Sequence, residues 1–274
     1  MDVASWAAAA GLLLAGLASG SIASLLAVRI PARRSQQPSQ VSGPPPDVME
    51  LDDRPPHDSR PPHDDRPLDP AELIPLFGWL RLRSRYPACR AEFGIWYPAA
   101  ELITAGIFVA LWFQFGPSPA LPAFCYLAVV SVTLAFIDAR HKRLPNALTL
   151  PSYPAALILL GIGAVFVPGG TRHFADALIG MAAAWLFFVL QAFIYPAGIG
   201  WGDVKLSGVL GLYLGWFGAR ALLIGLLGGY LLAAVAAIGL LLASRATWKS
   251  MLPFGPFLLA SSLAVIIAGG SPFR

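Results

Sequence analysis

The chain has 274 residues, of which 57% are hydrophobic and only 12% are charged, and its formal net charge is +4. A mean hydropathy of +0.66 would leave too much apolar surface in contact with water, which excludes an ordinary soluble domain and favours a polytopic membrane protein. The basic residues follow a topological pattern, so their excess does not indicate nucleic-acid binding, and two cysteines are too few for a disulfide framework.

The first apolar run extends from about Trp6 to Val28 and is long enough to cross a hydrocarbon core, which needs roughly 20 helical residues. A cleaved signal peptide would begin with basic residues and have a shorter apolar core. Here the early charge is Asp2, and the arginines begin after the run, at Arg29. We therefore expect residues 1–28 to form a retained transmembrane helix whose C-terminal end faces the cytoplasm.

Residues 29–96 are expected to form a cytoplasmic loop. Its first part, residues 32–70, is rich in Pro, Asp, His and Arg, with a near-repeat from Arg54 to Asp65 that could form a weak metal site. Such a composition is more typical of an extended, disordered linker. From Leu73 to Tyr97, aromatic residues lie among arginines, which is typical of a segment at the level of the lipid headgroups, and we expect it on the inner leaflet.

Seven further apolar segments are separated by Gly, Pro or charged residues. They lie at about residues 97–115, 119–137, 147–167, 173–195, 204–217, 219–242 and 253–270. With the first run, they predict an all-α polytopic membrane protein with about eight transmembrane helices. If the N-terminus is periplasmic, all but three of the 19 basic residues (Arg172, Arg220 and Arg274) fall on the cytoplasmic side, as the positive-inside bias predicts.

Two carboxylates share the cytoplasmic side of this arrangement. Asp138 ends the third segment, and Asp203 begins the sixth within the stretch GIGWGDVKL, whereas Asp176 falls near the outer end of the fifth. Acidic residues at membrane depth are costly and suggest a functional site. Two carboxyl groups a few ångströms apart share a proton, because each raises the cost of ionising the other. The ionised group can draw a proton from water while the other donates to a peptide carbonyl, which is amide hydrolysis without a metal.

Each aspartate also has a structural interpretation. Asp138 could pair with the basic residues that follow it, and Asp203 could cap the next helix. Gly200 and Gly202 would permit backbone geometries closed to other residues or the close approach of another chain. The segment after Asp203 has roughly 14 residues, about 21 Å as a helix against a hydrocarbon thickness of about 30 Å, so it must begin within the membrane or at a water-filled recess.

Several short motifs occur in the same order along the chain as in a known protein family. They are Gly20-Ser21 to Arg29-Ile30-Pro31, Ile74-Pro75-Leu76 to Trp79, Tyr97-Pro98 to Glu101-Leu102, Asp138 before Leu144-Pro145-Asn146, Gly200-Trp201-Gly202-Asp203 before Val204-Lys205-Leu206, and Pro253 to Leu258. Together they resemble the bacterial type IV prepilin peptidases, intramembrane aspartyl proteases of the GxGD type. The resemblance implies that residues 97–274 form the protease core and that Asp138 and Asp203 are catalytic. Such enzymes cut the basic leader from type IV prepilins or type II secretion pseudopilins at the cytoplasmic face of the inner membrane.

The chain departs from this family in its cytoplasmic loop. Many members carry two CxxC pairs thought to bind zinc, and also methylate the new N-terminus with S-adenosylmethionine. Here Cys89 matches one cysteine position, Tyr86 stands where its partner would be, and the first pair has no counterpart. Zinc held by four thiolates is therefore not expected. The resemblance leaves methylation with S-adenosylmethionine open, and the sequence has no Gly-rich loop that would support it.

Supporting positions and other functions also stay open. Gly200, Gly202, Lys205, Pro253, Gly255 and Glu101 are the supporting candidates. Glu101 could orient the loop or match a helix dipole, Lys205 could tune Asp203 or contact headgroups, and the Pro253 segment could present backbone to the substrate or start the last helix. A proton-coupled transporter would instead place paired carboxylates near the midplane among inverted repeats. A non-catalytic assembly protein is the other alternative, and the oligomeric state is not indicated.

Overall fold

The computed structural model describes residues 8–20, 96–195, 199–243 and 253–269. Every regular element in these ranges is a helix: Ala8–Gly20, α3 (Trp96–Phe115), α4 (Leu121–His141), α5 (Asn146–Phe166), α6 (Gly170–Ile194), α7 (Trp201–Gly215), α8 (Ala219–Leu242) and α9 (Gly255–Ala268). The prediction of an all-α membrane protein is confirmed, and five of these helices, α3 to α6 and α8, are long and apolar enough to cross a bilayer. The expected linker, the headgroup-level segment up to residue 95 and Cys89 lie outside the described residues.

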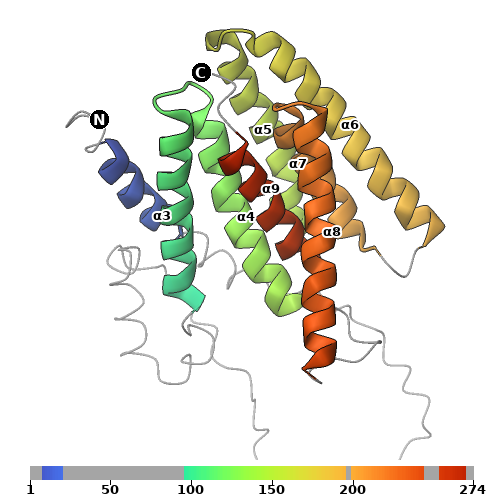
Figure 1. Cartoon of the computed structure of the whole chain (residues 1–274). Helices are drawn as coiled ribbons and strands as arrows, with labels where there is room; N and C mark the ends of the chain where they lie inside the picture. The colour runs from blue at the N-terminus through green and yellow to red at the C-terminus, as the bar shows by residue number, and fades with distance from the viewer. Residues whose placement is uncertain (1–7, 21–95, 196–198, 244–252, 270–274) are drawn as a thin grey trace, which may run out of the picture.

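Consecutive helices run in opposite directions, so the bundle has two distinct ends (Figure 1). At one end α4, α6 and α8 finish while α3, α5, α7 and α9 begin, and we call it the aspartate end because Asp138 and Asp203 lie there. Among the described residues, Arg140, Lys142, Arg143 and Lys205 are also at this end, whereas Arg172 and Arg220 lie at the opposite end, at the starts of α6 and α8.

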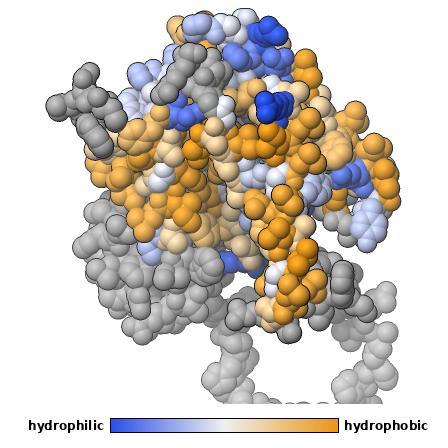
Figure 2. Space-filling model, viewed as in Figure 1, coloured by the Kyte–Doolittle hydropathy of each residue, from blue (hydrophilic) through white to orange (hydrophobic). Residues whose placement is uncertain are grey.

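The helix α7 is the central element of the bundle. It contacts α5, α6, α8 and α9, and its side chains from Leu206 to Gly215 are all buried. The long helices around it carry exposed apolar residues, among them Ile179 and Leu186 on α6 and Leu231 on α8. Figure 2 shows such hydrophobic residues over much of the visible face. This pattern, with apolar residues outside as well as inside, is that of a bundle whose solvent is lipid.

Small residues allow the central helix to approach α6 very closely. A Cβ placed at Gly211 would lie 2.4 Å from the carbonyl oxygen of Gly180, and one at Gly215 would lie 2.7 Å from the carbonyl oxygen of Asp176. Helices in membranes associate largely through such close backbone packing. The α6–α7 contact is the most extensive between the described helices, and it fixes the start of α7 relative to the rest of the bundle.

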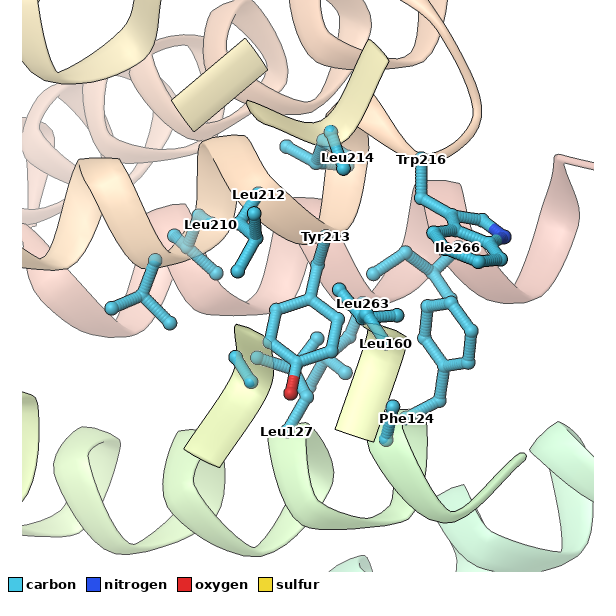
Figure 3. Packing of buried hydrophobic residues seen from close by; sticks show 14 of the residues in the cluster. Phe124, Leu127, Leu160, Leu210, Leu212, Tyr213, Leu214, Trp216, Leu263 and Ile266 are labelled. Carbon is cyan, nitrogen blue, oxygen red and sulfur yellow. The ribbon is translucent and has the colours of Figure 1, made fainter. Parts of the chain in front are cut away.

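The largest buried side chains lie toward the end of α7 that is remote from Asp203. Tyr213 packs edge-on against Phe124 of α4 with ring centres 5.7 Å apart, and Phe124 stacks on Phe115 of α3 at 4.6 Å. Figure 3 shows the rings of Tyr213 and Phe124 together with Trp216 and with leucines of α4, α5, α7 and α9. His173 of α6 also contacts the carbonyl oxygen of Trp216 through Nδ1 at 3.0 Å. The apolar core therefore anchors one end of α7, while the other end carries the polar residues.

Candidate active site

Asp138 lies in the last turn of α4, buried against the start of α9. The helix continues to His141 and ends at Lys142, whose left-handed conformation (φ 50°) lets its N–H bond to the carbonyl oxygen of Asp138 at 2.7 Å. The Asp138 side chain is 5% exposed, and its Oδ2 accepts the backbone N–H of Gly255 at 3.1 Å. Because Gly255 is the first residue of α9, the carboxylate lies at the positive end of that helix dipole.

The position of Asp138 separates the two interpretations of this residue. The basic residues Arg140, Lys142 and Arg143 are exposed, whereas the carboxyl group of Asp138 is turned into the bundle. An aspartate that served only to neutralise surface charge would remain beside those exposed side chains. The backbone contact with Gly255 instead assigns Asp138 to the interior of the aspartate end.

The start of α9 leaves room only for glycine beside Asp138. A Cβ built at Gly255 would lie 2.8 Å from Oδ2 of Asp138, so an added methyl group would displace the carboxylate. Pro256 follows in the first turn, where a missing N–H costs little. The half-buried Pro253 precedes Phe254, the N-cap of the helix. The segment thus starts the last helix and also donates a backbone N–H to a carboxylate.

Asp203 occupies the first turn of α7. The helix begins at Trp201 with Gly200 as its N-cap, so the expectation that Asp203 itself caps the helix is wrong. Its carboxylate reaches back to the backbone N–H of Gly200, and its own backbone N–H bonds to the carbonyl oxygen of Gly200 at 3.0 Å. This is the acidic half of a capping box, in which the third helical residue satisfies the N-cap N–H. Asp203 is partly exposed, so water can reach it.

The two carboxyl groups lie at the same end of the bundle, the aspartate end. Asp138 of α4 and Asp203 of α7 lie close enough to interact electrostatically, and each accepts a glycine N–H at the start of a helix. Asp176 does not join them, because its backbone packs against Gly215 at the far end of α7. The twelve residues from Asp203 to Gly215 correspond to about 18 Å of helix. The pairing expected from the sequence is therefore the one that the fold brings together.

Of the two glycines near Asp203, only Gly202 is required for space, and neither has a positive φ. Gly200 has φ −74° and ψ 143°, which any residue can adopt. A Cβ at Gly200 would lie 3.4 Å from Oδ2 of Asp203, an ordinary contact, whereas one at Gly202 would lie 2.9 Å from Cβ of Leu144. Of the two explanations in the sequence, close approach therefore applies at Gly202, where the α4–α5 connection crosses the start of α7.

Lys205 ties α7 to α5. Its Nζ donates to Oδ1 of Asn146 at 2.9 Å, and its carbonyl oxygen accepts the hydroxyl of Tyr153 at 2.6 Å. The lysine thus contacts an amide at the first residue of α5, directly after the connection that carries Leu144, which links the motif after Asp138 to the motif around Asp203. Lys205 is a support for the start of α7.

Glu101 lies away from the start of its helix and is fully buried. It is beyond the first turn of α3, so simple matching of the helix dipole does not explain it. A Cβ at Gly20 would lie 2.5 Å from Cα of Glu101, and one at Gly16 would lie 2.7 Å from Cα of Ala105. Glu101 therefore stands where the N-terminal helix and α3 make closest contact.

Sequence reasoning missed a polar pair on α6 and α8. The Tyr230 hydroxyl donates to Oε1 of Gln191, and Tyr230 interacts electrostatically with Asp203. The Tyr230 ring packs on Phe254 with centres 4.9 Å apart. A usable signal was present, because Gln191 interrupts an otherwise apolar run. Among the described residues, no group of three or more His, Cys, Asp or Glu could hold a metal ion.

Apolar helices that bring two carboxyl groups to one end of the bundle define a helical membrane protein with groups suited to acid–base chemistry. The model for the type IV leader peptidase family matches residues 125–269, and that for the bacterial peptidase A24 N-terminal domain matches residues 14–115. The chain belongs to the type IV leader peptidase family, and it is an aspartic peptidase, as the sequence predicted.

Curated relatives agree with this assignment. A protein of Aeromonas hydrophila named prepilin leader peptidase/N-methyltransferase is 36% identical over 209 residues, which cover 74% of this chain and 69% of the relative. A Bacillus subtilis (strain 168) protein of the same name is 31% identical over 208 residues, covering 74% and 79% of the two chains. A search of solved structures gave no significant match.

Proposed function

We propose that this chain is the endopeptidase that removes the basic leader from type IV prepilins or type II secretion pseudopilins at the cytoplasmic face of the inner membrane. In this proposal Asp138 and Asp203 are the catalytic pair, and the N-terminus is periplasmic. The observation that carries it is the placement of these two carboxyl groups at one end of the bundle, on α4 and α7, where they interact electrostatically. Family membership supports the class of substrate.

The mechanism uses one proton shared by the two carboxyl groups. The ionised carboxylate takes a proton from a water molecule, whose oxygen attacks the scissile carbonyl carbon, while the protonated carboxyl donates to the carbonyl oxygen. The resulting tetrahedral intermediate collapses, the C–N bond breaks and the leaving nitrogen takes a proton from the site. Fixed N–H donors from Gly255 and Gly200 hold the two carboxylates in place, so little reorganisation accompanies the reaction.

The location of the pair favours proteolysis over proton-coupled transport. Asp138 is in the last turn of α4 and Asp203 in the first turn of α7, so both are at helix ends. A transporter would be expected to place its coupling carboxylates near the bilayer midplane. A pair at the end of the bundle can be reached by water and by a peptide that enters from the aqueous side.

Methylation of the new N-terminus is a second activity suggested by the names of the relatives. It would require S-adenosylmethionine. Among the described residues, Glu101 is fully buried in the contact between the N-terminal helix and α3. No step of the peptidase mechanism depends on it.

The proposal is tested by changing the two aspartates separately. Asp138→Asn and Asp203→Asn should each reduce trimming of a co-expressed type IV prepilin by about 10²–10⁴-fold, because each removes one proton-transfer group. Asp176→Asn is the matched control and should trim normally, since Asp176 lies at the far end of α7. Mass spectrometry of the prepilin N-terminus reports both the cut position and any methyl group. Normal trimming by both aspartate variants would contradict the proposal.

A further inference from the structure

A tyrosine–glutamine pair joins two apolar helices near the candidate site. Gln191 lies near the end of α6 and Tyr230 in the middle of α8, both of which are candidate membrane spans. The Tyr230 hydroxyl donates to Oε1 of Gln191. Polar side chains are costly within apolar helices and are commonly functional there. The pair therefore needs an explanation beyond the packing of α6 on α8.

Aromatic contacts connect this pair to Asp138. The Tyr230 ring packs on Phe254 at 4.9 Å and on Phe188 at 5.9 Å between ring centres. Phe254 directly precedes Gly255, whose N–H holds the Asp138 carboxylate at 3.1 Å. Tight packing of α8 on α9 fixes this arrangement, since a Cβ at Gly229 would lie 2.9 Å from Cα of Leu258. Tyr230 is thus held by the segment that also holds Asp138.

The pair is also connected to Asp203. Tyr230 interacts electrostatically with the Asp203 carboxylate, and its ring packs on Phe254, which directly precedes the Gly255 that holds Asp138. Both Gln191 and Tyr230 are partly exposed, so neither side chain is closed off by the protein. Helices α4, α6, α7, α8 and the start of α9 therefore each contribute a polar group or a ring to one region.

The hydrogen bond between Tyr230 and Gln191 leaves each side chain able to form a further hydrogen bond. The Tyr230 hydroxyl uses its hydrogen in the bond to Gln191. Its oxygen can still accept a hydrogen bond, and the amide nitrogen of Gln191 can still donate one. A peptide must be extended at the bond to be cut, and its backbone N–H and C=O groups then lack helical partners. In surroundings with little water, such groups need partners from the protein.

We propose that Gln191 and Tyr230 form a backbone-binding pair that holds the extended substrate strand beside the bond to be cut. The Gln191 amide donates to a substrate carbonyl, and the Tyr230 oxygen accepts a substrate N–H. The pair positions the peptide between Asp138 and Asp203 and takes no part in proton transfer. Because the pair binds backbone groups and not side chains of the substrate, it can hold prepilins of different sequence. This inference rests on the proposed function.

The test compares variants of the full-length protein on one purified prepilin that the unaltered chain trims. Tyr230→Phe keeps the ring against Phe254 and removes only the hydroxyl, while Gln191→Met keeps the length of the side chain and removes the amide. Each should lower kcat/KM about tenfold, as expected for one or two lost hydrogen bonds. The loss should appear as a higher KM with nearly unchanged kcat, since the contact is made in both the bound and the transition state.

Tyr126→Phe provides the control for a purely structural bond between helices. Its hydroxyl bonds Oγ of Ser152 at 3.4 Å, joining α4 to α5. The twelve residues between Tyr126 and Asp138 place it about 18 Å along α4 from the site. This variant should keep the KM of the unaltered protein, and the melting temperature is measured for all variants.

Three results would overturn the inference. The first is an unchanged KM in both Tyr230→Phe and Gln191→Met. The second is a rise of KM in Tyr126→Phe equal to that in these two variants. The third is a fall in kcat in the two site variants that parallels a fall in their melting temperature, with KM unchanged. If Tyr230→Phe does not fold, Gln191→Met alone decides between these outcomes and the expected one. Failure of the unaltered protein to trim any prepilin would instead count against the proposed function, so the two failures are distinguishable.

Discussion

The two aspartates are held by glycine N–H groups with different tolerances for added atoms. At Gly255 a Cβ would lie 2.8 Å from Oδ2 of Asp138, closer than real Cβ contacts allow. At Gly200 the corresponding distance to Oδ2 of Asp203 is 3.4 Å, an ordinary contact, and the backbone angles suit any residue. The glycine near Asp138 is therefore under the stricter constraint, although it lies outside the GxGD pattern.

This difference predicts an order of effects among alanine substitutions. Gly255→Ala should lower kcat by about 10²-fold, because displacement of a catalytic group by about 1 Å is that costly. Gly200→Ala should change kcat by about threefold or less, as expected when the perturbation is on the order of 0.5 kcal/mol. Gly106→Ala on α3, where a Cβ meets nothing within 4 Å, is the control. The explanation fails if Gly200→Ala is the more damaging change in a prepilin-trimming assay.

Some residues of the candidate site could be located from the sequence, and others could not. Asp138 and Asp203 could be predicted because carboxylates are rare and costly in so apolar a sequence. The contact of Gly255 with Asp138 depends on how α9 packs on α4, which no local pattern encodes. Gln191 and Tyr230 were missed because α6 and α8 are apolar on all sides, so periodicity does not show which face of either helix points toward the site.

At the scale of the element, α7 depends on glycine to pack against α6. A Cβ at Gly211 would lie 2.4 Å from the carbonyl oxygen of Gly180 and 2.7 Å from Cβ of Ala184. One of these atoms belongs to the backbone of a long helix, so the contact cannot be relieved by turning a side chain. The separation of α6 and α7 is thus set by residues without side chains.

Gly211→Ala should therefore lower the thermal stability of the protein. Alanine favours the helix by about 1 kcal/mol over glycine, but overpacking typically costs about 1–3 kcal/mol and here involves backbone, so the steric term should prevail. The matched control is Gly239→Ala on α8, where a Cβ meets nothing within 4 Å and only the propensity gain applies. Thermal unfolding in detergent measures both, and a Gly211→Ala protein that melts no lower than the unaltered one would refute the packing argument.

Helix positions followed closely from the apolar runs. The predicted segment 219–242 matches α8 (Ala219–Leu242), and the segment 147–167 matches α5 (Asn146–Phe166) within one residue at each end. The end of α4 was less predictable: the apolar run stops near residue 137, but the helix continues through Asp138 to His141 before Lys142 ends it. Hydropathy marks where lipid contact ceases, whereas the backbone hydrogen bonds continue for another turn.

At the scale of the whole molecule, charge distinguishes the two ends of the bundle. Within the described ranges the aspartate end carries Arg140, Lys142, Arg143 and Lys205, and the opposite end carries Arg172 and Arg220. Basic residues are enriched on the cytoplasmic side of membrane proteins. This asymmetry supports the orientation proposed for the active site.

The orientation can be tested with single exposed cysteines in a chain whose two native cysteines are replaced by serine. Thr171→Cys, at the start of α6, should react with a membrane-impermeant maleimide in intact spheroplasts. His141→Cys, at the end of α4, should react only after the membrane is permeabilised. Prepilin trimming verifies that each variant is folded. Labelling in the reverse pattern would place the aspartate end outside and exclude cleavage of a cytoplasmic leader.

The shortness of α7 affects any experiment that counts membrane crossings. With 15 residues, α7 spans about 22 Å, and it is not among the helices long enough to qualify as a candidate span. Its burial explains how so short a helix persists, because protein and not lipid surrounds it. A topology map that requires about 20 apolar residues for each span would omit α7 and would draw α8 in the reverse direction. A reporter fused just after α8 would then appear to contradict that map, although the reporter had answered correctly.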